Sequence, residues 1–346
     1  RFPEDFDGYI VGAPVNDYTG QQMTAPAKLR PLYSRIPPRA GMQAIDGPVV
    51  SPAKRNMLHD AIYSRCDALD GVVDGQLRNP LKCDFDPALH IAACSDTSGP
   101  DCLTPAELAA VQEIYAGKEP FVPGVPYGSE NIPGGWSQWI LPNSPTGTPA
   151  LHTIMVDAFE WLMFNPDRPG YDYLTLWDWN VEPFLMEEAK QIYNATDPNL
   201  QAAFDKGKKI LMWHGWNDPG ANPIRSIRYR DAVVKSMEDS RGKAHGRKRV
   251  HGDTFLGEKL TDQFLKLYLV PGVAHCGGGV GHGTVDWLSP LVNWVENGVE
   301  PTTIVGSRTV SGATSTRPHC PYPQEAVYDG AGNPDVAASY SCKLVD

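Results

Sequence analysis

The chain has 346 residues, a length typical of two domains or of one large domain with an insertion. Its 41 acidic and 30 basic residues give a net charge of -11, which argues against a nucleic-acid partner because phosphate backbones attract an excess of Lys and Arg. Its apolar runs are far shorter than the roughly 18 residues of a membrane span, which argues against a membrane partner. Because the sequence opens on Arg1 without an initiator Met or a signal peptide, we expect it to begin inside a longer product.

The first predicted element is a short buried strand at 9–14, which a Gly/Pro turn ends. A long section from about 20 to about 205 follows and is rich in Pro, Gly, Trp and Tyr. Helix signals inside it predict three helices, which begin at Ser51-Pro52, begin at Thr104-Pro105, and span 157–164.

The character of the chain changes near residue 206. Compact apolar runs at 208–213 and 265–270 predict two buried strands, and the segment 222–237 between them predicts a helix. A further helix is predicted from Ser289-Pro290 to Gly298. The alternation of strand, loop and helix indicates an α/β sheet, in which chemistry gathers at the carboxyl ends of the strands.

Asp218 and His275 lie on the loops that follow the two strands. A serine hydrolase needs a His to carry the nucleophile's proton and a carboxylate to orient that His. In α/β-hydrolases these residues follow the nucleophile in the order Ser, Asp, His, so Asp218 and His275 fit the last two members. The alternative is that Asp218 caps a helix and that His275 is an ordinary loop histidine.

No Ser in the chain has Gly at both the -2 and +2 positions that a nucleophile elbow requires. Ser137 comes near, with Gly135 before it, but Trp139 stands after it. If the protein is an α/β-hydrolase, we expect its nucleophile to lie outside this chain.

The seven cysteines indicate an oxidising compartment, because six of them form close couples: 66 with 83, 94 with 102, and 320 with 342. Six cysteines allow 15 pairings, so sequence alone leaves the connectivity open. Cys276 is left over, which suggests a free thiol or a partner outside the chain. No CxxC occurs, which weakens a zinc interpretation.

The segment 66–75 contains a candidate calcium loop. Calcium prefers six to eight hard oxygens on a loop that glycines allow to curl. The side chains of Asp67, Asp70 and Asp74 and the carbonyls of Val72 and Gln76 would supply most of them. The loop lacks the Glu that closes an EF-hand, so an Asp/Gly-rich surface turn is the alternative.

Three further features of the sequence carry weaker signals. Most of the Trp and Tyr residues between 136 and 179 are expected to be core, although an aromatic ester would stack on such rings. Arg225, Arg228 and Arg230 are expected to form a solvated helix face. Asn194-Ala195-Thr196 is a glycosylation sequon that is common by chance.

The chain strongly resembles the tannase and feruloyl esterase family, which also contains mono(2-hydroxyethyl) terephthalate hydrolases. The resemblance covers nearly the whole chain and rests on these blocks: RFPEDFDGYIVGAP (1–14), CDALDGVVDG (66–75), CLTPAE (102–107), GSE (128–130), HGWNDP (214–219), LVPGVAHCGGGVG (269–281), NWVENGVEP (293–301) and TRPHCPYPQ (316–324).

The resemblance implies an α/β fold: an α/β-hydrolase core with a large inserted lid. Residues 1–20 would belong to the core after the nucleophile helix, 21–205 would be the lid with its calcium loop, and 206–346 would be the C-terminal part of the core. It further implies triad roles for Asp218 and His275. Together with proximity, it favours bonds 66–83, 94–102 and 320–342. Cys276 would pair with a cysteine beside the nucleophilic Ser, which this chain lacks.

The activity that the resemblance implies is hydrolysis of aromatic-acid esters through an acyl-enzyme. The Ser would come from a segment or chain outside this one, linked through Cys276. We expect a structural Ca²⁺ and a secreted or periplasmic location. The alternative is a non-catalytic remnant or a calcium-bound binding module.

Overall fold

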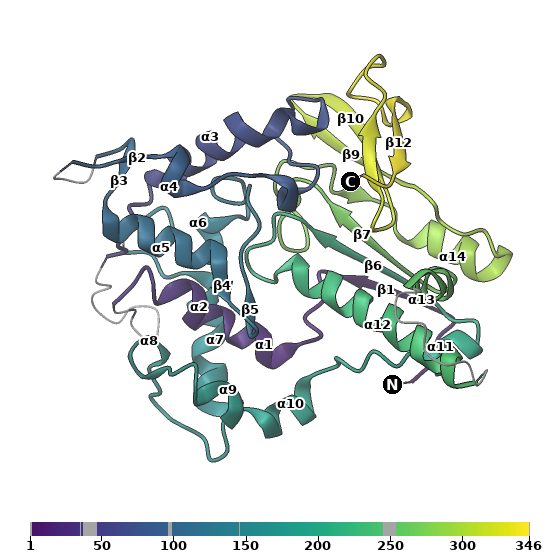
Figure 1. The fold of residues 1–346 in the computed structure, drawn as a ribbon, viewed down its shortest axis with the longest axis horizontal. Helices are drawn as coiled ribbons and strands as arrows, with labels where there is room; N and C mark the ends of the chain where they lie inside the picture. Colours follow the sequence, from purple (N-terminus) through teal and green to yellow (C-terminus); the bar gives the residue numbers. More distant parts are fainter. Residues whose placement is uncertain are drawn as a thin grey trace.

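A parallel sheet lies at the centre of the computed structural model, which describes residues 2–34, 36, 47–95, 99–144, 146–244 and 254–345. Its strands are β1 (Gly8–Gly12), β6 (Lys209–Gly215) and β7 (Leu265–Val270), in the order β1-β6-β7 (Figure 1). Gly8 pairs with Lys209, and Ile210 pairs with Leu265. The second and third strands therefore confirm the two apolar runs as neighbours in one parallel sheet.

Helices cover both faces of this sheet because alternate strand residues point to opposite sides. Met212 and Leu267 pack in one buried cluster with α12 (Pro223–Ala244) and α13 (Thr254–Asp262). Leu211 and Tyr268 pack in another with α14 (Leu288–Asn297). Within the described ranges, no strand pairs with the outer edge of β1, where Ile10 is 40% exposed.

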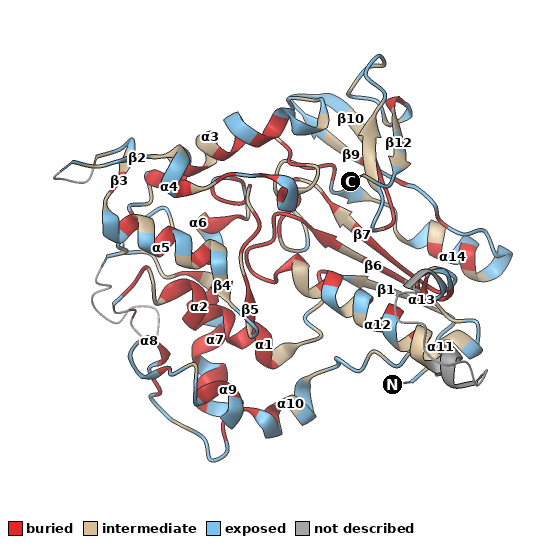
Figure 2. Ribbon diagram, viewed as in Figure 1, coloured by how far each residue is buried: buried red, intermediate tan, exposed pale blue. Residues whose placement is uncertain are grey.

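The long connection between the adjacent strands β1 and β6 contributes the largest buried cluster (Figure 2). Its helices are α1 (Tyr18–Gln22), α2 (Thr24–Leu29), α3 (Lys54–Cys66), α4 (Pro87–His90), α5 (Pro105–Ala116), α6 (Trp136–Trp139), α7 (Ala150–Trp161), α8 (Tyr173–Leu176), α9 (Glu182–Leu185), α10 (Glu187–Tyr193) and α11 (Gln201–Asp205). Two short ribbons accompany them: β2 (Ala92–Ala93) with β3 (Cys102–Leu103), and β4 (Gly117–Lys118) with β5 (Val122–Pro123). Trp136, Trp139 and Trp177 are buried as expected for core residues, whereas Trp161 is exposed.

The C-terminal part adds antiparallel hairpins that the sequence analysis did not predict. Strand β9 (Ile304–Val310) pairs with β10 (Ala313–His319) and with β8 (Thr284–Val285), and β11 (Glu325–Tyr328) pairs with β12 (Tyr340–Lys343). Three short 3-10 turns complete the described elements: η1 (Asp67–Asp70), η2 (Pro80–Lys82) and η3 (Ala337–Ser339).

Local sequence signals located some helix ends and missed others. The prediction of a helix beginning at Ser51-Pro52 was wrong, since α3 begins at Lys54 and Ala53 is its N-cap residue. The helix predicted over 222–237 extends to Ala244. Thr104 caps α5 in a capping box with Glu107, and Gly298 ends α14 with a positive φ of 70°. The prediction for 157–164 was wrong in its bounds, since α7 ends at Trp161 and begins at Ala150. Its buried residues Leu151, Met155, Val156 and Phe159 form the apolar stripe that sets its real extent.

The three predicted cysteine pairs form disulfide bonds: Cys66–Cys83, Cys94–Cys102 and Cys320–Cys342. Cys276 is free and exposed. In the described portion of the chain, no helix has the length and apolar character needed to cross a bilayer.

The two ends of the long connection meet beside the sheet. The Asn194 side chain accepts a hydrogen bond from Thr19 N at 2.9 Å and donates to Asp17 Oδ1 and Thr19 Oγ1, both at 3.0 Å. Ala195 N donates to Asn16 O at 2.7 Å. The sequon residue Asn194 thus joins the first and last residues of this connection by hydrogen bonds.

Candidate active site

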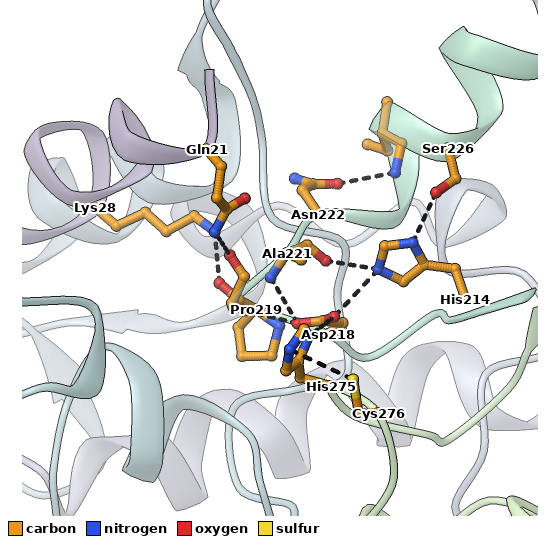
Figure 3. Close-up of polar contacts among 12 residues, drawn as sticks. Gln21, Lys28, His214, Asp218, Pro219, Ala221, Asn222, Ser226, His275 and Cys276 are labelled. Atoms are coloured by element: carbon orange, nitrogen blue, oxygen red, sulfur yellow. Dashed lines mark hydrogen bonds and ion pairs between the residues drawn. The ribbon is translucent and has the colours of Figure 1, made fainter. Parts of the chain in front are cut away.

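Asp218 and His275 lie side by side on the loops that follow β6 and β7 (Figure 3). His275 Nδ1 is 2.7 Å from Asp218 Oδ2, although 57 residues separate them in sequence. The carboxylate is 1% exposed, and the His275 side chain retains 27% exposure. The parallel register of β6 and β7 brings the two loops to one edge of the sheet, as the strand order requires.

The protein surrounds the Asp218 carboxylate with hydrogen-bond donors. Gly220 N and Ala221 N each donate to Oδ1 at 2.8 Å, so Asp218 also caps the turn that follows it. Burial by itself raises the pKa of Asp218, but the hydrogen bonds from His214 and His275 lower it below its ordinary value. Asp218 is therefore held as a buried anion.

His275 is held in the orientation of a general base. Its hydrogen bond to Asp218 raises its pKa above the ordinary value, against an opposing effect of burial. The opposite ring nitrogen, Nε2, lies 3.5 Å from Cys276 Sγ, and Trp139 packs edge-on at a ring-centroid distance of 5.1 Å. Among the described residues, His275 makes side-chain hydrogen bonds with Asp218 and Cys276 and with no serine.

Hydrogen bonds from both the side chain and the backbone of Asn217 hold the two loops together. Asn217 Oδ1 accepts a hydrogen bond from Gly272 N at 2.8 Å, and Asn217 N donates to Val273 O at 3.0 Å. A Cβ on Gly215 would lie 2.2 Å from the Val273 carbonyl oxygen, so this close approach requires glycine. The relative position of Asp218 and His275 is thereby fixed by the backbone as well as by their own contact.

Three further polar residues, which the sequence analysis missed, converge on the Asp218 loop. His214 Nε2 lies 3.1 Å from Asp218 Oδ2 (Figure 3). Lys28 Nζ donates to Pro219 O, and Gln21 Nε2 donates to Gly220 O, both at 2.7 Å. Burial lowers the pKa of Lys28 to about 7. The position of His214, four residues before Asp218, was a usable signal, whereas nothing in the sequence pointed to Lys28 or Gln21.

The acidic loop folds with its carboxylates turned towards its own backbone. Asp67 accepts hydrogen bonds from Asp74 N and Gly75 N at 3.4 and 3.1 Å, and Asp70 Oδ1 accepts from Val72 N at 3.0 Å. Burial raises the pKa of Asp70 to about 6, and the nearby charge of Asp74 adds to the effect. Burial also raises the pKa of Asp74, in spite of Arg317 Nη2 at 2.8 Å from its Oδ2. At Asp70 and Asp74, burial therefore outweighs the hydrogen bonds and positive charges that favour the ionised carboxylate.

This loop fits calcium in donor type and in charge, but it is not a closed cage of side chains. Over the residues that the structure describes, no three His, Cys, Asp or Glu side chains converge as a metal cluster. A calcium ion here would need the carbonyls of Val72 and Gln76 as well as the carboxylates. Gln76 itself is buried and its Oε1 lies 3.3 Å from His282 Nδ1.

The prediction that the arginines of α12 form a solvated face was wrong for two of them. Arg230 is fully buried and bonds Glu258 Oε2 at 2.5 Å and Asp262 Oδ1 at 3.1 Å. Arg225 pairs with Asp17 and donates to the carbonyls of Gly20 and Phe121. Only Arg228 has the exposed position that was expected, where it pairs with Glu119. Acidic side chains and carbonyl groups of distant segments bind Arg225 and Arg230.

Comparison with known proteins gives consistent relationships. A family model described as tannase and feruloyl esterase matches residues 1–343. The chain is 28% identical over 388 residues to mono(2-hydroxyethyl) terephthalate hydrolase of Piscinibacter sakaiensis and 30% identical over 355 residues to a probable feruloyl esterase of Arthroderma benhamiae. Each match covers 99% of this chain and 60% of the relative, so the chain spans about three fifths of these relatives' length.

Solved structures show the same fold. Feruloyl esterase B from Aspergillus oryzae superposes with a TM-score of 0.77 at 23% identity, over 99% of this chain and 65% of its own. Tannin acyl hydrolase from Aspergillus niger gives a TM-score of 0.67 at 20% identity, over 100% of this chain and 61% of its own. These likenesses show that the chain shares the α/β fold of those two structures.

Proposed function

Because the chain belongs to the tannase and feruloyl esterase family, we propose that it is part of a serine carboxylic-ester hydrolase that acts on esters of aromatic acids. The observation that carries the proposal is the buried hydrogen bond of 2.7 Å between Asp218 Oδ2 and His275 Nδ1 at the carboxyl ends of adjacent parallel strands. The names of relatives, which include feruloyl esterases and a terephthalate monoester hydrolase, support the substrate class.

In the proposed reaction, Nε2 of His275 takes the hydroxyl proton of a serine that attacks the ester carbonyl. The protonated imidazole then gives this proton to the departing alcohol, and an acyl-enzyme remains. Nε2 of His275 then takes a proton from a water molecule that attacks the acyl carbonyl, and it returns this proton to the serine oxygen as the acyl–oxygen bond breaks and the acid leaves. Asp218 stays ionised throughout, because its hydrogen bonds hold its pKa low.

The serine in this proposal comes from a segment outside the chain. Support comes from the absence of any Ser with Gly at both -2 and +2, and from the lack of a described serine hydrogen-bonded to His275. Cys276 is free, exposed and adjacent to His275, a position suited to a disulfide with a cysteine beside that serine. The competing proposal is a non-catalytic remnant or binding module, and the contact of His275 Nε2 with Cys276 rather than with a described serine is the observation that favours it.

Residues 21–205 would act as the lid of this hydrolase, with 1–20 and 206–346 in its core. The insertion of this segment between two adjacent strands supports the division. Trp139 reaches from the segment to His275 and would contribute an aromatic wall near the reacting ester.

The activity is tested with methyl ferulate, methyl gallate and mono(2-hydroxyethyl) terephthalate. Residues 1–346 alone are compared with the product that also contains the upstream segment, each as wild type and as His275→Ala. We expect turnover only in the longer product, and its loss in His275→Ala. Hydrolysis by the longer product that survives His275→Ala would overturn the esterase proposal, and turnover by residues 1–346 alone would overturn the external serine.

We also propose that the acidic loop binds one structural Ca²⁺ through Asp67, Asp70 and Asp74 with the carbonyls of Val72 and Gln76. The ion would neutralise carboxylates that now repel one another. Three disulfides support a secreted or periplasmic location, since such bonds persist in oxidising compartments.

A further inference from the structure

The Asp218 carboxylate has a second histidine partner that the proposed reaction does not use. Oδ2 of Asp218 lies 2.7 Å from His275 Nδ1 and 3.1 Å from His214 Nε2, so two imidazoles share one oxygen (Figure 3). His214 lies on β6 and is completely buried. It cannot reach a substrate, and any effect that it has on chemistry must pass through Asp218.

The neighbours of His214 fix which ring nitrogen carries a proton. Nε2 faces two acceptors, Asp218 Oδ2 and the carbonyl oxygen of Ala221 at 2.8 Å, so Nε2 must be the donor. Nδ1 lies 2.8 Å from Ser226 Oγ, whose hydroxyl can supply the hydrogen that a neutral ring accepts. The hydrogen-bond chain therefore runs from Ser226 to His214 to Asp218 and meets the one from His275.

We infer that His214 is a positioning residue, which orients Asp218 and limits how strongly its carboxylate polarises His275. This inference rests on the proposed function, because it concerns the same dyad. Oδ1 is already occupied by two backbone amides, so the His214 hydrogen bond fixes the remaining freedom of the carboxylate. Without this donor, Oδ2 would carry more negative charge towards His275 and hold its proton more tightly.

Other charged or titratable groups also surround the dyad and must stay in place during a test. Lys28 of α2 donates to Pro219 O and acts on Asp218 through its charge. Arg225 of α12 lies near Lys28, and Cys276 lies beside His275. The wild type and every variant carry Lys28, Arg225 and Cys276, so a difference between them in the titration of His275 reports on the change at His214.

The variants separate the hydrogen bond from the bulk of the ring. His214→Leu removes the donor, and His214→Gln places an amide N–H near the position of Nε2. Ser226→Ala removes only the support of Nδ1, and is the milder change if His214→Leu fails to fold. His319→Leu is the matched control, because His319 is also a buried histidine that bonds a carbonyl, that of His282 at 3.0 Å, on another loop.

The primary readout is the titration of the His275 ring by NMR in residues 1–346, which needs no nucleophile. We expect the His275 pKa to rise in His214→Leu, to rise less in Ser226→Ala, and to stay near wild type in His214→Gln and His319→Leu. An unchanged His275 titration in His214→Leu, or in Ser226→Ala where His214→Leu does not fold, would overturn the inference.

The second readout is turnover by the longer product that contains the upstream segment. We expect kcat to fall about 10–100-fold in His214→Leu with little change in KM, as for loss of a hydrogen bond to a charged group. The acid limb of the pH profile of kcat should move to higher pH in His214→Leu, because the pKa of His275 rises. His214→Gln should recover most of the activity. Failure of the esterase proposal would appear instead as turnover that survives His275→Ala, so the two failures are distinguishable.

Discussion

The buried Asp218 carboxylate and the partly buried carboxylates of the acidic loop have pKa values that the protein shifts in opposite directions. Asp218 accepts four hydrogen bonds, from Gly220 N, Ala221 N, His214 and His275, and its pKa is lowered. Asp70 and Asp74 of the acidic loop have raised pKa values because burial outweighs the donors around them. The comparison teaches that burial alone does not decide the charge of a carboxylate, because the number of donors aimed at it can reverse the effect.

The difference also separates two uses of a buried negative charge. At Asp218, hydrogen-bond donors within the chain stabilise the ionised carboxylate, which can orient a histidine. At the acidic loop, the donors within the chain do not offset burial, and the calcium ion that we propose would stabilise the ionised carboxylates.

The largest expected effect is on turnover. Asp218→Asn should lower kcat of the longer product by about 10⁴-fold, because an amide fails to hold His275 in the required tautomer and to stabilise its charged form. Asp70→Asn is the control and should leave kcat within a few fold. The measurement is steady-state kinetics on methyl ferulate. Equal losses in both variants would remove the functional distinction between the two clusters.

The next effect is on stability in the presence of calcium. At a calcium concentration about 100-fold above its dissociation constant, residues 1–346 should gain about 2.7 kcal/mol in the free energy of unfolding. Asp70→Asn should lose most of this gain. Asp84→Asn, a change at an exposed residue paired with Arg65, should keep it. Thermal unfolding with EDTA and with added calcium measures the difference. A wild-type melting temperature that is the same under both conditions would contradict the metal assignment.

The third prediction concerns Lys28, the buried lysine whose charge acts on Asp218. Burial lowers its pKa in the folded chain to about 7, below the ordinary 10.5, so the folded state binds fewer protons than the unfolded state between these pH values. Stability contributed by this group therefore rises as pH rises through that range. The free energy of unfolding of wild type relative to Lys28→Met should increase by about 2 kcal/mol from pH 7 to pH 9. Denaturant titrations at both pH values measure it, and a pH-independent difference would show that Lys28 is charged in the folded chain.

The smallest effect concerns Arg317, which neutralises part of the acidic loop through Asp74 at 2.8 Å. Arg317→Met should lower the free energy of unfolding by about 1–2 kcal/mol without calcium. The loss in the free energy of unfolding should be smaller with calcium bound, because the ion replaces the positive charge that Arg317→Met removes. Arg65→Met removes an exposed pair elsewhere and should show no such calcium dependence. An equal loss with and without calcium would mean that Arg317 stabilises the chain through its contact with the Tyr340 ring rather than through Asp74.

Features governed by neighbouring residues followed from the sequence. The run Leu265–Val270 forms β7 with the predicted bounds, and Thr104 forms the capping box with Glu107. The three disulfides join cysteines that are close in sequence, with separations of 17, 8 and 22 residues. The sequence also predicted that Asp218 and His275 lie on the loops after two strands, and both residues do.

Only the tertiary structure decided which distant groups surround those residues. Lys28 reaches Pro219 across 191 positions, and Arg230 is buried by two acidic residues of another helix rather than solvated. The second histidine on Asp218 was visible in the sequence as a residue four positions upstream, but its role depends on the rotation of its ring between Ser226 and Ala221. Local sequence signals located the core strands and some helix caps, because hydrogen bonds in caps and turns are local, but they missed the bounds of α7 and the C-terminal hairpins. The pKa of a buried group depends on donors and charges that folding brings from elsewhere in the chain, and no local pattern specifies them.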